Sequence, residues 1–417
     1  MIAKARIPHR RKSILGRLLQ AFCIGMLVIA AQAAAESPNP ADWPQVEREA
    51  RGQSVYFNAW AGEPKINDYI AWVATQVEQR FGIDLVHVKL ADTAVAVSRV
   101  LAEKQAGNTT NGAVDLLWIN GENFAALKNA GLLFGPWAEQ LPNFHLTDPD
   151  NNPAVRTDFT VPVEGYEAPW SKARVVFYYD GAVTGPPPRS IAELLPWARQ
   201  HRGQFTYARP PQFIGTTFLK QALLELASDR QALYAPVEQA DFAAVTAPLW
   251  AYLDALHPYL WRSGRAFPDS GPALRRLLAD GELSLAYTFS AGDVVAAIAR
   301  RELPVGVRSY VFDSGTIGNV NFLAIPFNAR HKAAAMVVAN FLLSPEAQAR
   351  KLDPQVWGSA TVLSLAQLDA ADRARFATWA TLPGALPATA PTRVLAEPHP
   401  SWVATLEHAW LQRYVGR

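Results

Sequence analysis

The sequence contains a single cysteine, Cys23, among its 417 residues. Cys23 lies inside an apolar segment near the amino terminus, and Phe22 does not fit a lipoprotein signal, which has small residues just before the cysteine. We therefore expect Cys23 to be removed together with that segment. The remaining chain then has no thiol, which excludes a disulfide framework, thiolate catalysis and thiolate metal ligands. Its stability must come from buried apolar area.

The first 35 residues have the order of a secretory signal peptide. Positions 4–17 hold six basic residues and no acidic one, positions 18–30 are almost entirely apolar, and alanines precede Glu36. The apolar run is shorter than the roughly 20 residues that a membrane span needs, which argues against an anchor. Arg10 and Arg11 leave general and twin-arginine export both open. We predict a cleaved signal peptide (1–35) and a periplasmic mature protein that is not lipid-anchored.

An excess of positive charge is also lacking once the signal peptide is removed. The full chain has 39 basic and 37 acidic residues, a formal net charge of +2. Without the six basic residues of the signal, 33 basic residues face 37 acidic ones. This balance excludes nucleic acid as a partner. Apolar runs after Glu36 are strand-sized, so we expect a soluble monomer, and a chain of this length favours two lobes.

Catalytic signatures are missing as well. The sequence has no G-x-S-x-G nucleophile elbow, no H-E-x-x-H pair and no glycine-rich phosphate loop, and its histidines are scattered singly. We therefore predict no catalytic residue, no metal site and no cofactor. Carboxylates are numerous enough to leave an acid/base pair open, so a periplasmic hydrolase or lyase remains the alternative to a binding protein.

Strand-like and helix-like segments alternate after Glu36. The expected strands are 55–57, 85–88, 114–119, 174–179, 205–207, 284–289 and 320–325. The expected helices include 64–82, 93–105, 120–131, 216–226, 271–280, 290–300, 332–343 and 345–352. A proline- and aromatic-rich passage at 142–169 separates two series of such units. Repeated βα units predict an α/β fold with mostly parallel sheets and right-handed crossovers.

Four loops that follow expected strands combine aromatic, amide and hydroxyl residues. In parallel α/β sheets ligands bind beyond the carboxyl ends of the strands, where these loops lie. Aromatic faces allow stacking, and short polar groups at helix starts give directional hydrogen bonds, a mixture that suits a small polar solute. The candidate binding residues in the loops are Asn58, Trp60, Glu63, Trp118, Asn120, Gly121, Glu122, Gln212, Phe213, Gly215, Thr216, Tyr287, Ser290 and Asp293.

Each candidate also has a structural interpretation. The tryptophans can pack at the edge of a core, and the chain has 13 of them. Asn120, Thr216 and Ser290 are ordinary helix N-caps. Glu63 and Glu122 precede or begin helices, where they complement the helix dipole. The binding hypothesis rests on the coincidence of all four loops.

Four segments resemble the extracellular solute-binding proteins of ABC importers, and most closely the YnjB-type branch. They are V-D-L-L-W-I-N-G-E-N-F at 114–124, R-V-V-F-Y-Y-D at 174–180, G-E-L-S-L-A-Y at 281–287 and F-L-L-S-P-E-A-Q at 341–348. They occur in the expected order, and the resemblance covers essentially the whole mature chain. One departure is Tyr179-Asp180, where many relatives have Tyr-Asn, so the resemblance supports no polar hinge contact there.

The resemblance implies a two-lobed, type II periplasmic-binding fold with the ligand cleft at the hinge. The first lobe would hold 36–169 and 318–343, and the second 172–313 and 346–417, with crossings near 170–173, 314–317 and 344–345. Trp118 would stack on the solute, facing the loops before Gly215 and after Tyr287. Trp170 would lie near the hinge and completes the set of candidate binding residues.

The resemblance also implies partners and a mechanism. The lobes would close on a small-molecule solute and present it to a membrane permease whose cytoplasmic ATPase is a separate subunit. The aromatic loops with Glu63, Glu122 and Asp293 favour an organic cation, thiamine-like or an amine, through stacking and cation–π attraction. A neutral sugar ranks second. An oxyanion held by Arg209 and the helix start at Thr216 ranks third.

Overall fold

The computed structural model describes residues 37–182, 185–376, 381–387 and 389–415. The expected signal peptide, including Cys23, lies outside these residues. The chain divides into Met1–Pro38 and a compact unit Asn39–Arg417, and the following description concerns the second unit. Among the described helices, none combines the length and the apolar character that a membrane crossing requires.

The larger sheet has the strand order β11-β10-β3-β1-β2, and β6 pairs with β10 as well. Its strands are β1 (Ser54–Trp60), β2 (Asp84–Leu90), β3 (Leu116–Ile119), β6 (Glu167–Arg174), β10 (Thr316–Ala324) and β11 (Val394–Leu395). β1 is parallel to β2 and β3, as the repeated βα units predict. The loops that follow β1 and β3 therefore lie at the same edge of the sheet.

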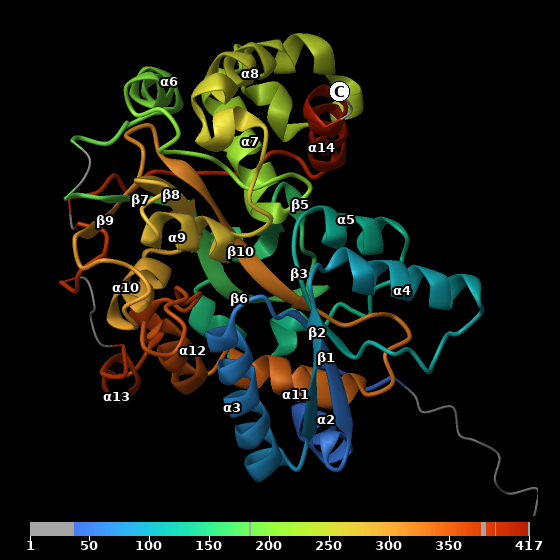
Figure 1. Cartoon of the computed structure of the whole chain (residues 1–417). Helices are drawn as coiled ribbons and strands as arrows, with labels where there is room; N and C mark the ends of the chain where they lie inside the picture. Colours follow the sequence, from blue (N-terminus) through green and yellow to red (C-terminus); the bar gives the residue numbers. More distant parts are fainter. Residues whose placement is uncertain (1–36, 183–184, 377–380, 388, 416–417) are drawn as a thin grey trace, which may run out of the picture. The chain divides into compact units, whose positions relative to one another are not determined.

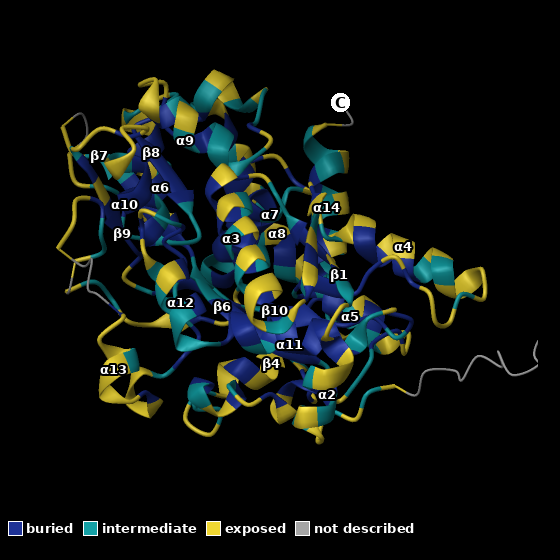
Figure 2. Ribbon diagram, turned by 90° about the horizontal axis from the view of Figure 1, so that it is seen from below, coloured by how far each residue is buried: buried dark blue, intermediate teal, exposed yellow. Residues whose placement is uncertain are grey.

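Helices cover this sheet and bury its apolar side chains in a first core. They are α2 (Trp43–Ala50), α3 (Pro64–Phe81), α4 (Ala94–Gln105), α5 (Glu122–Asn129), α11 (Lys332–Leu342) and α12 (Pro345–Leu352). In α3 the proline at the first position fits the helix start, and Gly82 ends the helix at a φ of 66°. α11 is buried along most of its length (Figure 2), which its run of alanines and valines allows by packing closely.

A second sheet has the order β8-β7-β9. Its strands are β7 (Val176–Asp180), β8 (Leu285–Thr288) and β9 (Val307–Tyr310). Both pairings are antiparallel, which corrects the expectation of a mostly parallel sheet. The reason is that β8 and β9, which run the same way and are joined through a helix, have β7 inserted between them in the opposite direction. Residues 205–207, expected as a strand, form none, although Tyr207 is buried.

The helices around this sheet form a second core. They are α6 (Ile191–Gln200), α7 (Phe213–Leu226), α8 (Phe242–Leu256), α9 (Gly271–Ala279), α10 (Ala291–Ala299) and α14 (Ser401–Tyr414). The remaining short elements are α13 (Ala370–Arg373), β4 (Thr157–Asp158) and β5 (Val161–Pro162). The 3₁₀ helices are Ala138–Gln140, Phe144–Thr147, Pro153–Arg156, Gln231–Tyr234, Val237–Gln239, His257–Tyr259, Trp261–Gly264 and Leu365–Gln367.

β6 and β10 connect the two cores. They pair antiparallel from Glu167–Ala324 at one end to Arg174–Gly318 at the other, with a register shift between Asn321 and Phe322. β10 contributes Phe322 to the first core and Ile317 to the second. Figure 1 shows β10 running obliquely from the side of β7 and β8 to the side of β3. The middle of this pair is therefore the natural place for a cleft between the cores.

The carboxyl-terminal region packs differently from the expected lobe assignment. The sequence places 346–417 with the second lobe, but Ala347, Trp357, Val362 and Phe376 belong to the first core. Within this region Leu395 and the helix α14 pack in the second core. The physical reason is that α12 follows α11 directly and remains beside it, so the chain returns to the second core only after residue 376.

Gln348, the last residue of the F-L-L-S-P-E-A-Q segment, joins three parts of the first core. Its side chain is fully buried, and its Nε2 donates to the carbonyl oxygens of Trp170 (2.9 Å) and Leu342 (2.8 Å). Its Oε1 accepts from the Thr361 hydroxyl (2.8 Å) and the Val362 amide (3.2 Å). The side-chain amide of Gln348 therefore donates two hydrogen bonds and accepts two.

Replacing Gln348 by leucine should lower the free energy of unfolding by about 2–4 kcal/mol, because several buried polar groups lose their partner at once. Urea unfolding followed by circular dichroism measures this change. The exposed Gln367, replaced in the same way, is the matched control and should change stability by less than about 0.5 kcal/mol. Equal stability of the two variants would contradict the role given to Gln348.

Candidate functional site

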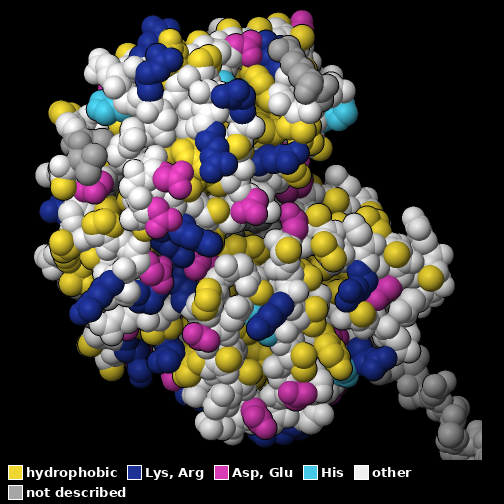
Figure 3. All heavy atoms as spheres, viewed as in Figure 1, with side chains coloured by type: hydrophobic (Ala, Val, Ile, Leu, Met, Phe, Trp, Pro, Cys, Tyr) yellow, Lys and Arg dark blue, Asp and Glu magenta, His cyan; other side chains and the backbone are white. Residues whose placement is uncertain are grey.

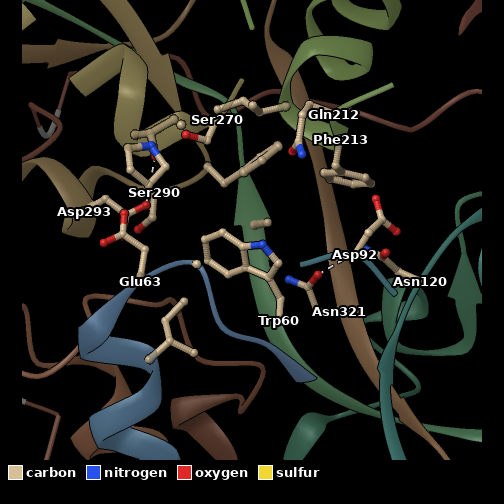
Figure 4. A pocket seen from close by; sticks show the side chains of 18 of the residues that line it. Trp60, Glu63, Asp92, Asn120, Gln212, Phe213, Ser270, Ser290, Asp293 and Asn321 are labelled. Carbon is tan, nitrogen blue, oxygen red and sulfur yellow. Dashed lines mark hydrogen bonds between the residues drawn. The ribbon is translucent and has the colours of Figure 1, made fainter. Parts of the chain in front are cut away.

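A cavity of about 610 Å³ lies between the two cores. From the first core it is lined by the loops after β1, β2 and β3, and from the second core by the first turns of α7, α9 and α10. The middle of β6 and β10 forms its floor, through side chains such as Ser171 and Asn321. Figure 4 shows these side chains converging from both sides on one space. Figure 3 shows acidic and basic side chains gathered in the middle of the face viewed there.

Ten of the fifteen candidate binding residues line this cavity. They are Trp60, Glu63, Trp118, Asn120, Glu122, Gln212, Phe213, Thr216, Ser290 and Asp293. They come from all four loops that the sequence singles out, so the structure brings these loops together. Direct contact of these side chains with a solute stays a prediction.

The other five candidates lie outside the lining and have structural contacts. Asn58 is fully buried and donates to the Tyr56 carbonyl oxygen (3.2 Å). Trp170 is fully buried, and the Tyr287 hydroxyl donates to the Ile214 carbonyl oxygen (3.0 Å). These three side chains are buried in the cores and do not line the cavity.

Two of the five are glycines that allow close approach of the backbone. Gly121 has a φ of 60°, its amide donates to Asp158 Oδ2 (2.6 Å), and a Cβ there would lie 2.6 Å from the Phe159 ring. At Gly215 a Cβ would lie 2.2 Å from the Ala208 carbonyl oxygen. Glycine is therefore required sterically at both positions.

Trp60 projects its indole ring into the middle of the cavity (Figure 4). The ring turns back over Gly62, where a Cβ would lie 2.2 Å from Trp60 Cζ2. Because Gly62 has no side chain, the indole ring of Trp60 can lie against the backbone at this position. The half-buried ring face is available for stacking on a flat group.

Trp118 lines the cavity from within an aromatic cluster. Its ring centroid lies 4.7 Å from that of Trp170 and 5.8 Å from that of Trp357, both in edge-to-face geometry. The rings of Trp170 and Trp357 are 5.4 Å apart. This packing fixes the orientation of Trp118, so it presents a rigid apolar wall.

Amide groups form a polar chain along the floor. Asn120 Nδ2 donates to Asn321 Oδ1 (3.0 Å), and Asn321 Nδ2 donates to the Ser171 hydroxyl (3.1 Å). Because Asn120 follows β3, Asn321 lies on β10 and Ser171 lies on β6, these hydrogen bonds run across three neighbouring strands. It offers neutral hydrogen-bonding groups beside the aromatic walls.

Two ion pairs join the cores at one edge of the cavity, here called the ion-paired edge (Glu63, Lys65, Arg275 and Asp293). Lys65 Nζ lies 2.6 Å from Asp293 Oδ1, and the lysine side chain is 7% exposed. Arg275 holds Glu63 through two bonds, Nη1–Oε1 at 2.8 Å and Nη2–Oε2 at 3.2 Å. The carboxylates of Glu63 and Asp293 are therefore already neutralised by cations of the protein.

The opposite side of the cavity, here called the acidic end, is formed by Asp92, Glu122 and Glu407. Burial raises the pKa of Glu122 above its usual range. Burial also raises the pKa of Glu407 to about 7, and the hydrogen bond from the Thr216 hydroxyl (2.6 Å) opposes that shift. In Figure 4 Asp92 and Asn120 point toward the same space from beside Phe213.

Several residues that line the cavity were not among the candidates predicted from the sequence. They include Lys65, Asp92, Ser171, Lys172, Lys220, Arg275, Asn319, Asn321, Trp357 and Glu407. Asp92 follows β2, so the rule used for the other loops would have found it. Lys65 is two residues beyond Glu63. Glu407 and Trp357 come from segments distant in sequence and have no local signal.

The composition of the lining suits recognition by contact. Among its described residues there is no histidine or cysteine, and in the described part of the chain no group of three or more His, Cys, Asp or Glu side chains is placed to hold a metal ion. Stacking faces, amides and carboxylates that converge on one enclosed space are the features of a small-molecule binding site.

The model of the bacterial extracellular solute-binding protein family matches residues 72–386. Protein YnjB of Escherichia coli (strain K12) is 48% identical over 373 residues, which cover 89% of this chain and 94% of YnjB. The periplasmic binding protein AfuA from Actinobacillus pleuropneumoniae has a TM-score of 0.60 at 14% identity, over 87% of this chain and 99% of AfuA. The substrate-binding protein PotD from Streptococcus pneumoniae has a TM-score of 0.58 at 13% identity, over 87% and 99% of the two chains.

The solved structures share the α/β architecture of type II periplasmic binding proteins with this chain. The family match spans most of the chain, and the identity to YnjB extends over nearly all of both proteins. The chain belongs to the bacterial extracellular solute-binding proteins.

Proposed function

We propose that the captured solute is an organic cation with a flat or ring-shaped part, a thiamine-like compound or an amine. The observation that carries this proposal is the acidic end of the cavity, where no ion pair of Glu122 is found among the described residues. Trp60 and Trp118 supply aromatic faces nearby, and a ring on the solute would stack on them. The positive charge of the solute would then compensate the buried carboxylate.

The structure changes which acidic residues support this proposal. Glu63 pairs with Arg275, and Asp293 pairs with Lys65, so cations of the protein already compensate both negative charges. Glu122 is the one of the three sequence candidates for which no ion pair is found among the described residues. The cation is therefore proposed to bind near α5 and not near the start of α3.

The other two solute classes rank lower. A neutral sugar, the second candidate, would use the amide chain of Asn120 and Asn321 together with Trp60. An oxyanion, the third, finds little support, because Arg209 is exposed and lies outside the lining. In addition, Thr216 donates its hydroxyl to Glu407, which places a carboxylate where the anion would bind.

We further propose that the cores act as two lobes that close about the β6–β10 pair. The first lobe would hold 36–169 and 318–343, extended to 376 because residues 347–376 pack in the first core. The second would hold 172–313 and the chain after 393. Closure joins the half-sites, and a solute touching both lobes favours the closed form by its differential contacts. As the proposed substrate-binding component of an ABC importer, the protein would then present its closed form to the membrane permease.

The protein is further proposed to be exported and to bind its solute without converting it. Residues 1–35 are proposed to act as a cleaved signal, with the mature protein a periplasmic monomer that does not catalyse a reaction. The matched family is extracellular and solute-binding, and the solved neighbour PotD is the substrate-binding protein of an ABC transporter, which supports this role over a hydrolase or lyase.

Native mass spectrometry of freshly purified protein, before and after incubation with cell extract, tests the solute class. We expect the protein to retain a small cationic compound unchanged, because the acidic end favours positive charge. A retained neutral sugar or an anion would contradict the ranking. Conversion of a retained compound into a new product would contradict the binding role.

The ion-paired edge gives a test of closure. Arg275→Met removes the partner of Glu63 and one of the two ion pairs between the cores, so the solute-free protein should populate the open form more and its mean radius of gyration in small-angle scattering should increase. Arg80→Met is the matched control, because Arg80 pairs with Glu346 (2.8 Å) inside the first core. The same radius for Arg275→Met, Arg80→Met and the unchanged protein would contradict closure through this edge.

A further inference from the structure

The acidic end contains a carboxylate oxygen without a partner. Glu122 Oε1 accepts a hydrogen bond from Asn123 Nδ2 (3.2 Å), whereas Oε2 is buried and accepts none from the described residues. Glu122 lines the cavity at the start of α5. A buried, unpaired carboxylate oxygen costs free energy unless a donor or a cation reaches it. A positively charged group of the solute would meet this need.

Lys220, the lysine near Glu122, forms an ion pair with another carboxylate. Lys220 Nζ lies 2.7 Å from Glu397 Oε2, and both side chains are almost completely buried. The ammonium also lies 4.6 Å from the ring centroid of Phe159 and 5.1 Å from that of Phe213. One carboxylate and two aromatic rings hold Lys220 in place at the acidic end. Because its positive charge is paired with Glu397, it does not compensate the negative charges of Glu122 and Glu407.

Glu407 enters the same end from α14. Its Oε1 accepts from the Thr216 hydroxyl of α7 at 2.6 Å. The charged groups that face it are Glu122 from α5, Lys220 from α7 and Asp92 from the loop after β2, and Glu122 itself faces Asp158 and Glu397. With a pKa of about 7, raised chiefly by burial, Glu407 is about half protonated at neutral pH.

We propose that the positive group of the solute binds between Glu122 and Glu407, and that its entry expels the proton of Glu407 into solvent. This inference rests on the proposed function and locates the charge within it. A cation next to Glu407 favours the carboxylate, so it lowers the pKa of that group in the complex. Because the proton must leave, the affinity for a cation increases as the pH rises through 7.

Benzyltrimethylammonium is a suitable probe, since it has a flat ring and a charge that does not change with pH. Calorimetry in phosphate and HEPES buffers at pH 7 should show a release of about half a proton for each probe bound. Between pH 6 and pH 8 the affinity should rise about tenfold, because a group with a pKa near 7 is mostly protonated at the first pH and ionised at the second. Benzyl alcohol, the neutral counterpart, should release no proton.

Three variants separate the roles. Glu407→Gln should bind benzyltrimethylammonium with the same affinity at pH 6 and pH 8 and release no proton. Glu122→Gln should bind it at least about tenfold more weakly at both values, through loss of a buried charge–charge contact. Glu78→Gln, on the exposed face of α3, is the control and should behave as the unchanged protein.

The inference is overturned if the unchanged protein gives no heat of binding with benzyltrimethylammonium, binds it without releasing a proton, or keeps its pH dependence in Glu407→Gln. These results can be distinguished from results that contradict the proposed cationic solute. A sugar retained in native mass spectrometry, with no response to the probe, overturns both the subsite and the cationic solute while capture of a solute stands. A retained cation without proton release overturns the subsite alone.

Discussion

The antiparallel pairing of β6 with β10 holds the two cores together and places the cavity between them. β10 contributes side chains to both cores, and β6, which pairs with it, is followed directly by β7 of the smaller sheet. The two sheets are therefore joined by one ladder whose middle forms the cavity floor. Gln348 fixes this crossing from the side of the first core by bonding to the Trp170 carbonyl oxygen. The site therefore lies where the two cores are connected by few strands, which is where a change in their relative orientation costs least.

Charge is distributed unequally around this floor. At the ion-paired edge, acidic and basic side chains of opposite cores neutralise each other, which favours contact between the cores. At the acidic end the carboxylates of Glu122 and Glu407 are not matched by a free lysine, because Lys220 is held by Glu397. One side of the cavity is thus suited to bring the cores together, and the other to select what they enclose.

The sequence predicts the parts of this structure that depend on local patterns. The strands β1, β2 and β3 and the helices α11 and α12 follow from periodicity and from proline and glycine at helix ends, and all four predicted loops reach the cavity. What it misses depends on tertiary contacts. The insertion of β7 between β8 and β9 reverses the predicted strand direction, and 347–376 return to the first core. Lys65 and Arg275 pair with residues more than 200 positions away, so no local motif reveals them.

Closure of the two cores on a cation can be measured as a distance across the cavity. In a chain beginning at Glu36, which has no cysteine, Glu78→Cys on α3 and Asp280→Cys after α9 place one spin label beside each core. Pulsed electron resonance with benzyltrimethylammonium should show a shorter and narrower distance distribution than without it. The same distribution in both conditions would contradict closure on a cation.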